Sequence, residues 1–383
     1  MAGIYFHIPF CKQACHYCDF HFSTSFKYKK NMLDAMAKEL RLQSNYLNRA
    51  QINTIYFGGG TPSILEASEI NFLLDEVSRH YDINHVTEIT LEANPDDLDK
   101  MKVEALRKTS ITRFSIGIQS FYDEDLKWMN RAHTAQEADS AIKRVQDAGF
   151  EDLTADLIYG YPLLSDEKWL SNIGKLVQLH IPHISAYSMT VEPRTALAHL
   201  IKTGKQKDMD DEQSAAQFLQ LIETLESNTY EHYEISNFAL PNRYAKHNTN
   251  YWKSEPYLGI GPSAHSFNNF QRQWNIHNNH QYIASINDRV VPFEMEILSE
   301  MDRINEYIMT SLRTMWGLNL DYIEDLYGSE SCRIIVNNAK QFEEENKLYR
   351  DQNTLKLTLS GKLMADHIAS ELFIEEEHEH KKN

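Results

Sequence analysis

Short apolar runs alternate with amphipathic stretches from residue 1 to about residue 190. Several of the runs, such as Ile55-Tyr56-Phe57, consist of β-branched and aromatic residues, which is typical of strands buried on both faces of a parallel sheet. The stretches between them have apolar residues at helical spacing, so strands and helices alternate as in a right-handed β/α array. The pattern predicts strands at Gly3–Ile8, Thr54–Gly58, Glu88–Glu92, Arg113–Ile118, Leu153–Tyr159 and His183–Ser188, and helices at Tyr28–Leu47, Ala67–His80, Asp99–Lys108, Ala135–Ala148 and Glu167–Leu179.

The pattern becomes less regular after Ser188. Asp210–Ser227 has the spacing of an amphipathic helix, and Glu231–Ala239 resembles a short strand. Lys246–Trp252 is a polar and aromatic segment without helical periodicity, and Gly259–Ser266 is rich in glycine and predicts a loop. We therefore expect one domain over residues 1–230 and an extension of it over residues 231–293.

The last part of the chain predicts a small separate domain over residues 294–374. Helices are followed by a hairpin at Lys347–Thr358 and a last helix from Ser360, an α+β order that resembles a winged helix. Such modules often bind DNA, but the acidic balance of this chain favours contacts with a partner or with the first domain. The charged tail, residues 375–383, contains His378 and His380, and we interpret it as a solvated end rather than a metal site.

Composition limits the function further. The chain has 383 residues with 42% hydrophobic residues, enough for a core of more than one average domain. Its formal charge is -17, with 55 acidic and 38 basic residues, which disfavours nucleic-acid partners. No apolar run is long enough to span a membrane, and the strand pattern begins at once, so we expect neither an integral membrane segment nor a targeting peptide.

The strongest chemical motif is the spacing of three cysteines, Cys11, Cys15 and Cys18, directly after the first strand. Thiolates held in one short loop select soft centres, which means zinc or an iron–sulfur cluster. Zinc would need a fourth ligand, for which His16 and His21 are the nearby candidates. A disulfide is disfavoured by the odd number and by the absence of a secretory segment, and free thiols indicate the cytoplasm.

Polar residues follow the other strands in the same way. The turn Gly58–Pro62 comes after the second strand, where it serves either as a tight turn or as a close approach to a ligand. In β/α arrays these strand ends meet on one face, where function is found. The polar positions on this face include Glu92, Gln119 and Asp156.

The spacing of apolar residues alone does not distinguish a doubly wound sheet from an open barrel.

The cysteine spacing, preceded by Tyr5–Phe10, resembles the radical S-adenosylmethionine (SAM) superfamily. Within it, the chain is similar to the group containing oxygen-independent coproporphyrinogen dehydrogenase and the HemW haem chaperones. The resemblance implies a six-stranded partial TIM-type barrel. It also implies that Cys11, Cys15 and Cys18 hold a [4Fe–4S] cluster whose fourth iron binds SAM. The positions that the resemblance assigns to SAM are Gly59, Gly60, Thr61, Glu92, Gln119, Arg131 and Asp156, with the aromatic rings of Tyr5 and Tyr17 beside them.

The segment His247-Asn248-Thr249-Asn250-Tyr251-Trp252 matches a signature of the haem-chaperone branch. A hydrogen-bonded loop histidine is the ordinary interpretation of His247, but the resemblance implies haem, so we predict His247 as its axial ligand. The dehydrogenase has a cysteine where this chain has Phe20, and it has a longer segment before the first cysteine. Both differences predict that coproporphyrinogen decarboxylation is absent.

The resemblance therefore implies a chaperone that binds haem and passes it to an unidentified acceptor protein, with the cluster aiding transfer or formation of a homodimer. A radical SAM enzyme acting on a tetrapyrrole is the alternative. A zinc-dependent binding protein is the third hypothesis, and the order of the SAM positions disfavours it.

Overall fold

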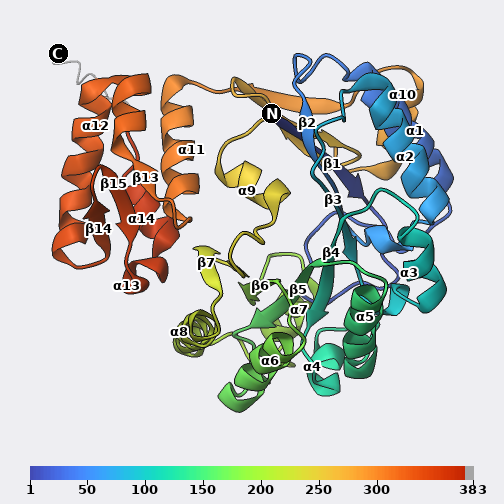
Figure 1. Ribbon diagram of the computed structural model, residues 1–383, viewed down its shortest axis with the longest axis horizontal. Coiled ribbons are helices and arrows are strands. Elements are labelled where there is room, and N and C mark those ends of the chain that lie inside the picture. Colours follow the sequence, from blue (N-terminus) through green and yellow to red (C-terminus); the bar gives the residue numbers. More distant parts are fainter. Residues whose placement is uncertain (376–383) are drawn as a thin grey trace.

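The computed structural model describes residues 1–375 and is organised around one sheet of twelve strands (Figure 1). Six strands at its centre run parallel and in chain order, which confirms the predicted α/β array. The sheet stays open, with β7 at one edge and β12 at the other, so the expected partial barrel is confirmed. The central strands are β1 (Ala2–Ile8), β2 (Ile52–Gly59), β3 (Glu88–Ala93), β4 (Arg113–Gln119), β5 (Asp152–Tyr159) and β6 (His183–Ser188).

The side chains of β1 alternate between an apolar face and a polar face of the sheet. Ile4, Phe6 and Ile8 are fully buried, and the Phe6 ring stacks on Phe57 of β2 at 4.8 Å. Tyr5 and His7 lie on the opposite face, because successive side chains of a strand point to opposite sides. The apolar face carries the core, and the other face is left for polar groups.

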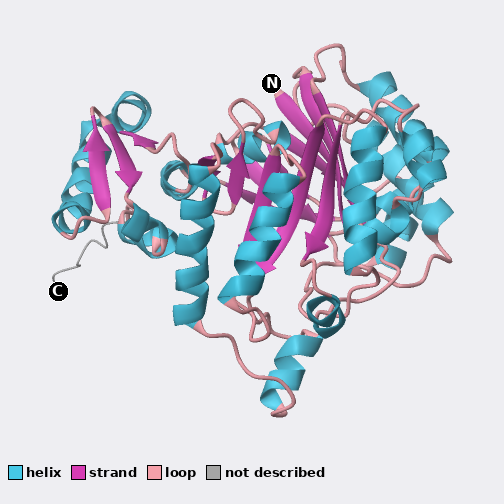
Figure 2. Cartoon of the chain, turned by 60° about the horizontal axis from the view of Figure 1, so that its bottom comes forward, coloured by secondary structure: helices cyan, strands magenta, loops and turns pink. Residues whose placement is uncertain are grey.

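Helices connect the central strands close to the predicted bounds. Two of these helices begin with a side-chain cap, since the side chains of Asp99 and Ser165 accept from the amides of Lys102 and Lys168. Gly149 follows a helix with a φ of 83°, a left-handed backbone that is typical of a helix end. Figure 2 shows the helices packed along the sheet. They are α1 (Lys29–Leu42), α2 (Ala67–His80), α3 (Lys100–Leu106), α4 (Asp123–Trp128), α5 (Ala135–Asp147), α6 (Asp166–Gln178), α7 (Ala196–Lys202) and α8 (Asp211–Ser227), with short 3-10 turns at Pro62–Ile64 and Pro95–Asp97.

The sheet is extended at both edges by the segment after α8. One hairpin pairs with β6, and β9 pairs in parallel with β1, so that Gly3 lies opposite Tyr257. The last strand pairs with β11 and continues this sheet across the predicted boundary at residue 294. The elements are β7 (Glu231–Glu234), β8 (Asn237–Ala239), β9 (Tyr257–Ile260), β10 (His265–Phe267), β11 (Gln271–Asn275), α10 (Asn279–Asn287) and β12 (Phe293–Ile297).

One segment of the extension differs from the prediction. Lys246–Trp252, expected to be irregular, forms helix α9. The carboxylate of Glu88 on β3 accepts hydrogen bonds from the backbone amides of Lys246 and His247, both at 2.9 Å. A helix start needs acceptors for its first amides, and here a residue distant in sequence supplies them, which local periodicity does not reveal.

The C-terminal domain has its own small core, which includes Ile308, Leu355 and Ile368. It combines helices with a three-stranded sheet, and its hairpin lies where the sequence predicts it. Figure 1 shows this domain beside the large sheet, with α9 between them and α11 as the helix of the domain nearest to the sheet. Its elements are α11 (Glu300–Leu312), β13 (Leu318–Asn319), α12 (Leu320–Glu344, interrupted at Gly328), β14 (Leu348–Asp351), β15 (Thr354–Leu357), α13 (Leu359–Lys362) and α14 (Ala365–Glu371).

The predicted charged tail lies outside the described residues except for residue 375. Among the helices that the structure describes, none has the length and apolar character needed to cross a bilayer.

Candidate cluster and SAM site

The cysteine loop begins directly after β1 and is fixed by backbone hydrogen bonds. The amide of Cys11 donates to the carbonyl of Ser23 at 3.1 Å, and the amide of Cys18 donates to the carbonyl of Cys15 at 3.4 Å. All three cysteines are free thiols, with Cys11 buried and the other two half-buried. Burial raises the pKa of Cys11 to about 11 and that of Cys18 to about 12, so both are protonated at neutral pH until a cationic centre displaces the proton.

The glycine turn Gly58–Pro62 after β2 is hydrogen-bonded to the start of the cysteine loop. The amides of Gly60 and Thr61 donate to the carbonyls of Ile8 and Phe10 at 2.9 and 2.8 Å. A Cβ atom on Gly60 would lie 2.6 Å from the oxygen of Phe10, so only glycine fits there. The hydroxyl of Thr61 donates to the Sγ atom of Cys11 at 3.4 Å. The turn therefore holds the first cysteine, whether or not it also contacts a ligand.

Arg131 reaches the second cysteine from the other side of the site. Its Nη1 atom donates to the Sγ atom of Cys15 at 3.4 Å, and its Nη2 atom donates to Asn94 Oδ1 at 2.7 Å and to the Gly117 carbonyl at 2.9 Å. Its Nε atom is buried and has no hydrogen-bond partner within the described residues. A buried donor without a partner is costly, and a carboxylate ligand would satisfy it.

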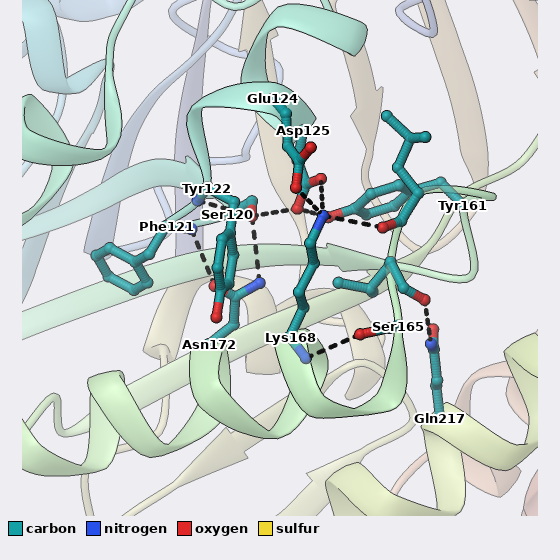
Figure 3. Close-up of polar contacts among 12 residues, drawn as sticks. Ser120, Phe121, Tyr122, Glu124, Asp125, Tyr161, Ser165, Lys168, Asn172 and Gln217 are labelled. Carbon is teal, nitrogen blue, oxygen red and sulfur yellow. Dashed lines mark hydrogen bonds and ion pairs between the residues drawn. The ribbon is translucent and has the colours of Figure 1, made fainter.

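A buried network holds the segment that carries Arg131 (Figure 3). Asp125 on α4 is fully buried and accepts from Ser120 Oγ and Tyr161 OH, each at 2.8 Å, and from Lys168 Nζ at 3.1 Å. The chain turns back to Arg131, whose amide donates to the carbonyl of Leu126 on the same helix at 2.8 Å. The network joins α4 to the β5–α6 connection and fixes the position from which the guanidinium enters the site.

Two carboxylates line the same cavity as the cysteines, Glu92 near the end of β3 and Asp156 within β5. Tyr56 OH donates to Glu92 Oε1 at 2.7 Å, and Ser115 Oγ donates to Asp156 Oδ1 at 3.3 Å. Burial is the main reason that the pKa of each rises to about 7. Both groups are therefore close to the point of charging at neutral pH, and a hydroxyl donor from a ligand would favour the charged form.

These groups line one cavity of about 480 Å³, a size typical of a small-molecule site. Gln119 enters it from the end of β4 with a φ of 67°, a left-handed backbone that turns the chain there. The structure thus brings together all the predicted site residues except Tyr5 and His247. The members are Cys11, Cys15, Cys18, Tyr17, Gly59, Gly60, Thr61, Glu92, Gln119, Arg131 and Asp156.

The residues present fit a cluster with SAM better than they fit zinc. His21 Nε2 is engaged 2.7 Å from Asn279 Oδ1, while His16 has its Nδ1 2.9 Å from the carbonyl of Trp128. Within residues 1–375 no three His, Cys, Asp or Glu side chains are grouped around a point suited to a single metal ion. A [4Fe–4S] cluster binds one thiolate on each of three irons, so its ligands need not converge on one point.

His247 lies outside this cavity and has no free nitrogen. Its ring is buried and stacks on Tyr56 at 5.0 Å. Nδ1 lies 2.8 Å from Thr54 Oγ1, and Nε2 lies 2.8 Å from Tyr251 OH. In this arrangement His247 supports Tyr251, and its role as an axial haem ligand stays a prediction that would require one of these hydrogen bonds to break.

A second, larger cavity of about 1580 Å³ lies between the sheet extension and α11. Tyr5 lines it, together with Tyr251 and Trp252 of the α9 signature. The two cavities share part of the segment Cys18–Phe22, which separates them.

Sequence reasoning did not single out Asn94 or Asp125. Asn94 follows β3 by one residue and bonds both Arg131 and Thr61, so its place at a strand end was a usable signal. Asp125 had no such signal, because an acidic residue in the first turn of a helix is ordinary and only the tertiary fold buries it.

Comparison with known proteins relates this geometry to a family. A model described as "Radical SAM superfamily" matches residues 5–175, and one described as "HemN C-terminal domain" matches residues 298–364. The chain is similar to proteins named "Heme chaperone HemW" from Lactococcus lactis, at 30% identity over 97% of each chain, and from Haemophilus influenzae, at 31% identity over 98% of each. The Bacillus subtilis protein of that name is 30% identical over 96% of this chain and 98% of its own.

One solved structure has a similar fold. Escherichia coli coproporphyrinogen III oxidase (HemN), described as a radical SAM enzyme, superimposes with a TM-score of 0.84 over 97% of this chain and 90% of its own. Its identity with this chain is 21%, so the likeness concerns the fold alone.

Proposed function

Because the chain belongs to the HemW family of haem chaperones within the radical SAM superfamily, we propose that it binds haem and passes it to a haem-dependent acceptor protein. The observation that carries the proposal is the extent of the match, which runs through the extension and the C-terminal domain as well as the radical SAM region. A shared radical SAM region alone would indicate only the superfamily.

In this proposal the cavity of 480 Å³ holds the resident cofactors. Cys11, Cys15 and Cys18 are the ligands of a [4Fe–4S] cluster. When bound, the cluster and SAM supply an iron centre able to deliver one electron to a sulfonium. The unpaired Nε of Arg131 supports binding of the SAM carboxylate, since guanidinium donors suit carboxylates.

The remaining polar groups orient the nucleotide. Asp156 accepts ribose hydroxyls, and Glu92 and Gln119 supply further hydrogen bonds at neighbouring strand ends. Tyr17 packs its ring against the ligand. Gly59, Gly60 and Thr61 bring backbone close to the methionine part, and Tyr5 supports the wall from the other cavity.

Haem itself is the cargo. The α9 signature supports this, because Tyr251 and Trp252 present aromatic surface to the larger cavity. The free thiols of the cluster loop favour a reducing compartment, so we place the protein in the cytoplasm.

Haem titration of the purified protein, reconstituted under argon with iron and sulfide, tests the function. We expect stoichiometric binding, followed by transfer when an apo-haemoprotein is added. The alternative enzyme would instead release 5′-deoxyadenosine and carbon dioxide from SAM and coproporphyrinogen, and that result without haem binding would overturn the proposal. Size-exclusion chromatography with and without the cluster decides whether the chaperone forms a homodimer.

A further inference from the structure

We propose that haem binds in the larger cavity, between the extension of the sheet and α11, and that the Nε2 atom of His277 bonds to its iron. This inference rests on the proposed haem binding and adds the place and the ligand.

The cavity has the size and the walls that a porphyrin needs. Its volume of about 1580 Å³ exceeds the range of about 300–1,000 Å³ that is usual for small-molecule sites. Tyr251, Trp252 and Phe267 line it from the extension, and Met309 and Phe373 line it from the C-terminal domain. Apolar and aromatic surface on facing walls suits the two faces of a flat macrocycle.

Four histidines line this cavity, and their hydrogen bonds distinguish them. His7 has both nitrogens engaged, with Nδ1 3.3 Å from Tyr5 OH and Nε2 2.9 Å from the carbonyl of His21. His21 has Nε2 on Asn279 at 2.7 Å, which leaves only the sterically hindered Nδ1. Neither side chain presents Nε2 to a ligand.

His277 presents the arrangement that haem iron requires. Its side chain is exposed, and its Nδ1 atom lies 2.8 Å from Ser263 Oγ. With the proton on Nδ1 and donated to that hydroxyl, Nε2 directs its lone pair outward. Nε2 has no hydrogen-bond partner in the described chain, and metal-bound histidines usually donate their other ring N–H to such an acceptor.

The loops carrying Ser263 and His277 are tied together. Ser263 has a φ of 66°, and its amide donates to the carbonyl of Ile276 at 3.2 Å. The amide of Asn275 donates back to Ala264 at 2.9 Å. The two backbone hydrogen bonds hold the loops together, and the hydrogen bond between Ser263 Oγ and Nδ1 orients the imidazole of His277. His265, the fourth histidine, is exposed but has no hydrogen bond that would orient its ring.

The cavity also contains a cation for the haem propionates. Arg194 lines it, is exposed, and makes no ion pair within the described residues. Arg272, by contrast, is paired with Glu296 and Glu306. Arg194 therefore remains available for a carboxylate of the cargo.

The test compares His277→Ala with His85→Ala, an exposed histidine that does not line the cavity. Both variants are reconstituted with the cluster, titrated with ferric haem, and examined by absorbance, electron paramagnetic resonance and resonance Raman spectroscopy. We expect His277→Ala to lose the iron–imidazole signature and at least tenfold in haem affinity, with the signature restored by added imidazole. His85→Ala should match the wild type, and cluster content should be equal in all proteins.

Ser263→Ala and His247→Ala refine the test. Ser263→Ala should keep the imidazole bond but shift its iron–nitrogen stretching frequency, because the ring loses its orienting acceptor. His247→Ala should retain the signature. If His277→Ala keeps the wild-type spectrum, or if only His247→Ala or His265→Ala abolishes it, the ligand is wrong while the haem-binding function stands. Failure of the wild type to bind haem would remove the function and this inference together.

Discussion

The guanidinium of Arg131 donates to the thiol of Cys15 at 3.4 Å while its own Nε stays buried without a partner. One side chain thus contacts a cluster ligand and lines the cavity in which that ligand lies. The planar guanidinium can donate to the thiol and to a ligand in fixed directions. The Asp125 network holds the segment that carries Arg131 in place.

Replacing Arg131 by lysine keeps the charge but removes the fork. We expect SAM binding to weaken by tenfold or more, since one hydrogen bond to a charged group contributes about 1.5–3 kcal/mol. Isothermal titration of the reconstituted protein measures this. Arg79→Lys, at an exposed surface ion pair, is the control and should leave the affinity unchanged. Equal affinity in both variants would exclude Arg131 from the SAM site.

Replacing Cys15 by alanine removes one cluster ligand. We expect iron and sulfide content after reconstitution to fall to a small fraction of the wild-type value, with loss of the brown chromophore, because two thiolates do not hold the cluster stably. Cys332→Ala is the matched control, since this fourth free cysteine lies on α12 in the C-terminal domain. Retention of the full chromophore in Cys15→Ala would refute the cluster site.

Asp125 should be a large contributor to stability. Replacing it by alanine leaves Ser120, Tyr161 and Lys168 without their shared acceptor. Breaking a buried charged network costs about 3–5 kcal/mol of unfolding free energy. Glu124→Ala removes the neighbouring, exposed partner of Lys168 and should cost less than about 1 kcal/mol. Denaturant unfolding of the two variants compares them, and similar losses would mean that the network is not what fixes α4.

Asp156 should make the cofactor-free protein less stable as the pH rises. Burial raises its pKa from 3.8 to about 7, so between these values the folded state holds a proton that the unfolded state has lost. The free energy of unfolding contributed by this group therefore falls as the pH rises from about 4 to about 7 and is level above that. Glu92, whose pKa also rises to about 7, adds to the trend.

Denaturant unfolding at about pH 5 and at about pH 8 measures this trend. Asp156→Asn should show a smaller loss between the two pH values than the wild type. Asp288→Asn, an exposed position after α10, should show the wild-type loss. An unchanged loss in Asp156→Asn would mean that this carboxylate titrates normally in the folded protein.

The positions of the strands and of most site residues could be predicted because both follow local rules. A buried strand reads as a continuous apolar run, and parallel strands end on one face. Cys11, Glu92 and Asp156 therefore come together once the strands are correctly placed. These rules require no knowledge of side-chain contacts.

The features that the sequence does not reveal are decided by tertiary contacts. Glu88 caps α9 from another strand, so the Lys246–Trp252 segment looked irregular. His247 has both nitrogens occupied by Thr54 and Tyr251, and the first of these partners is remote in sequence. His277 was not singled out, because its tautomer depends on Ser263 in a different loop.

The pairing of β1 with β9 has a consequence for how the chain is made. Residues 2–8 leave the ribosome early, yet one side of that strand gains its neighbour only when residues 257–260 have been translated. Until then an apolar ribbon with unpaired amides is exposed to other nascent chains, which is a known aggregation hazard. Folding of the newly made chain should therefore depend on molecular chaperones more than expected for a protein of this length.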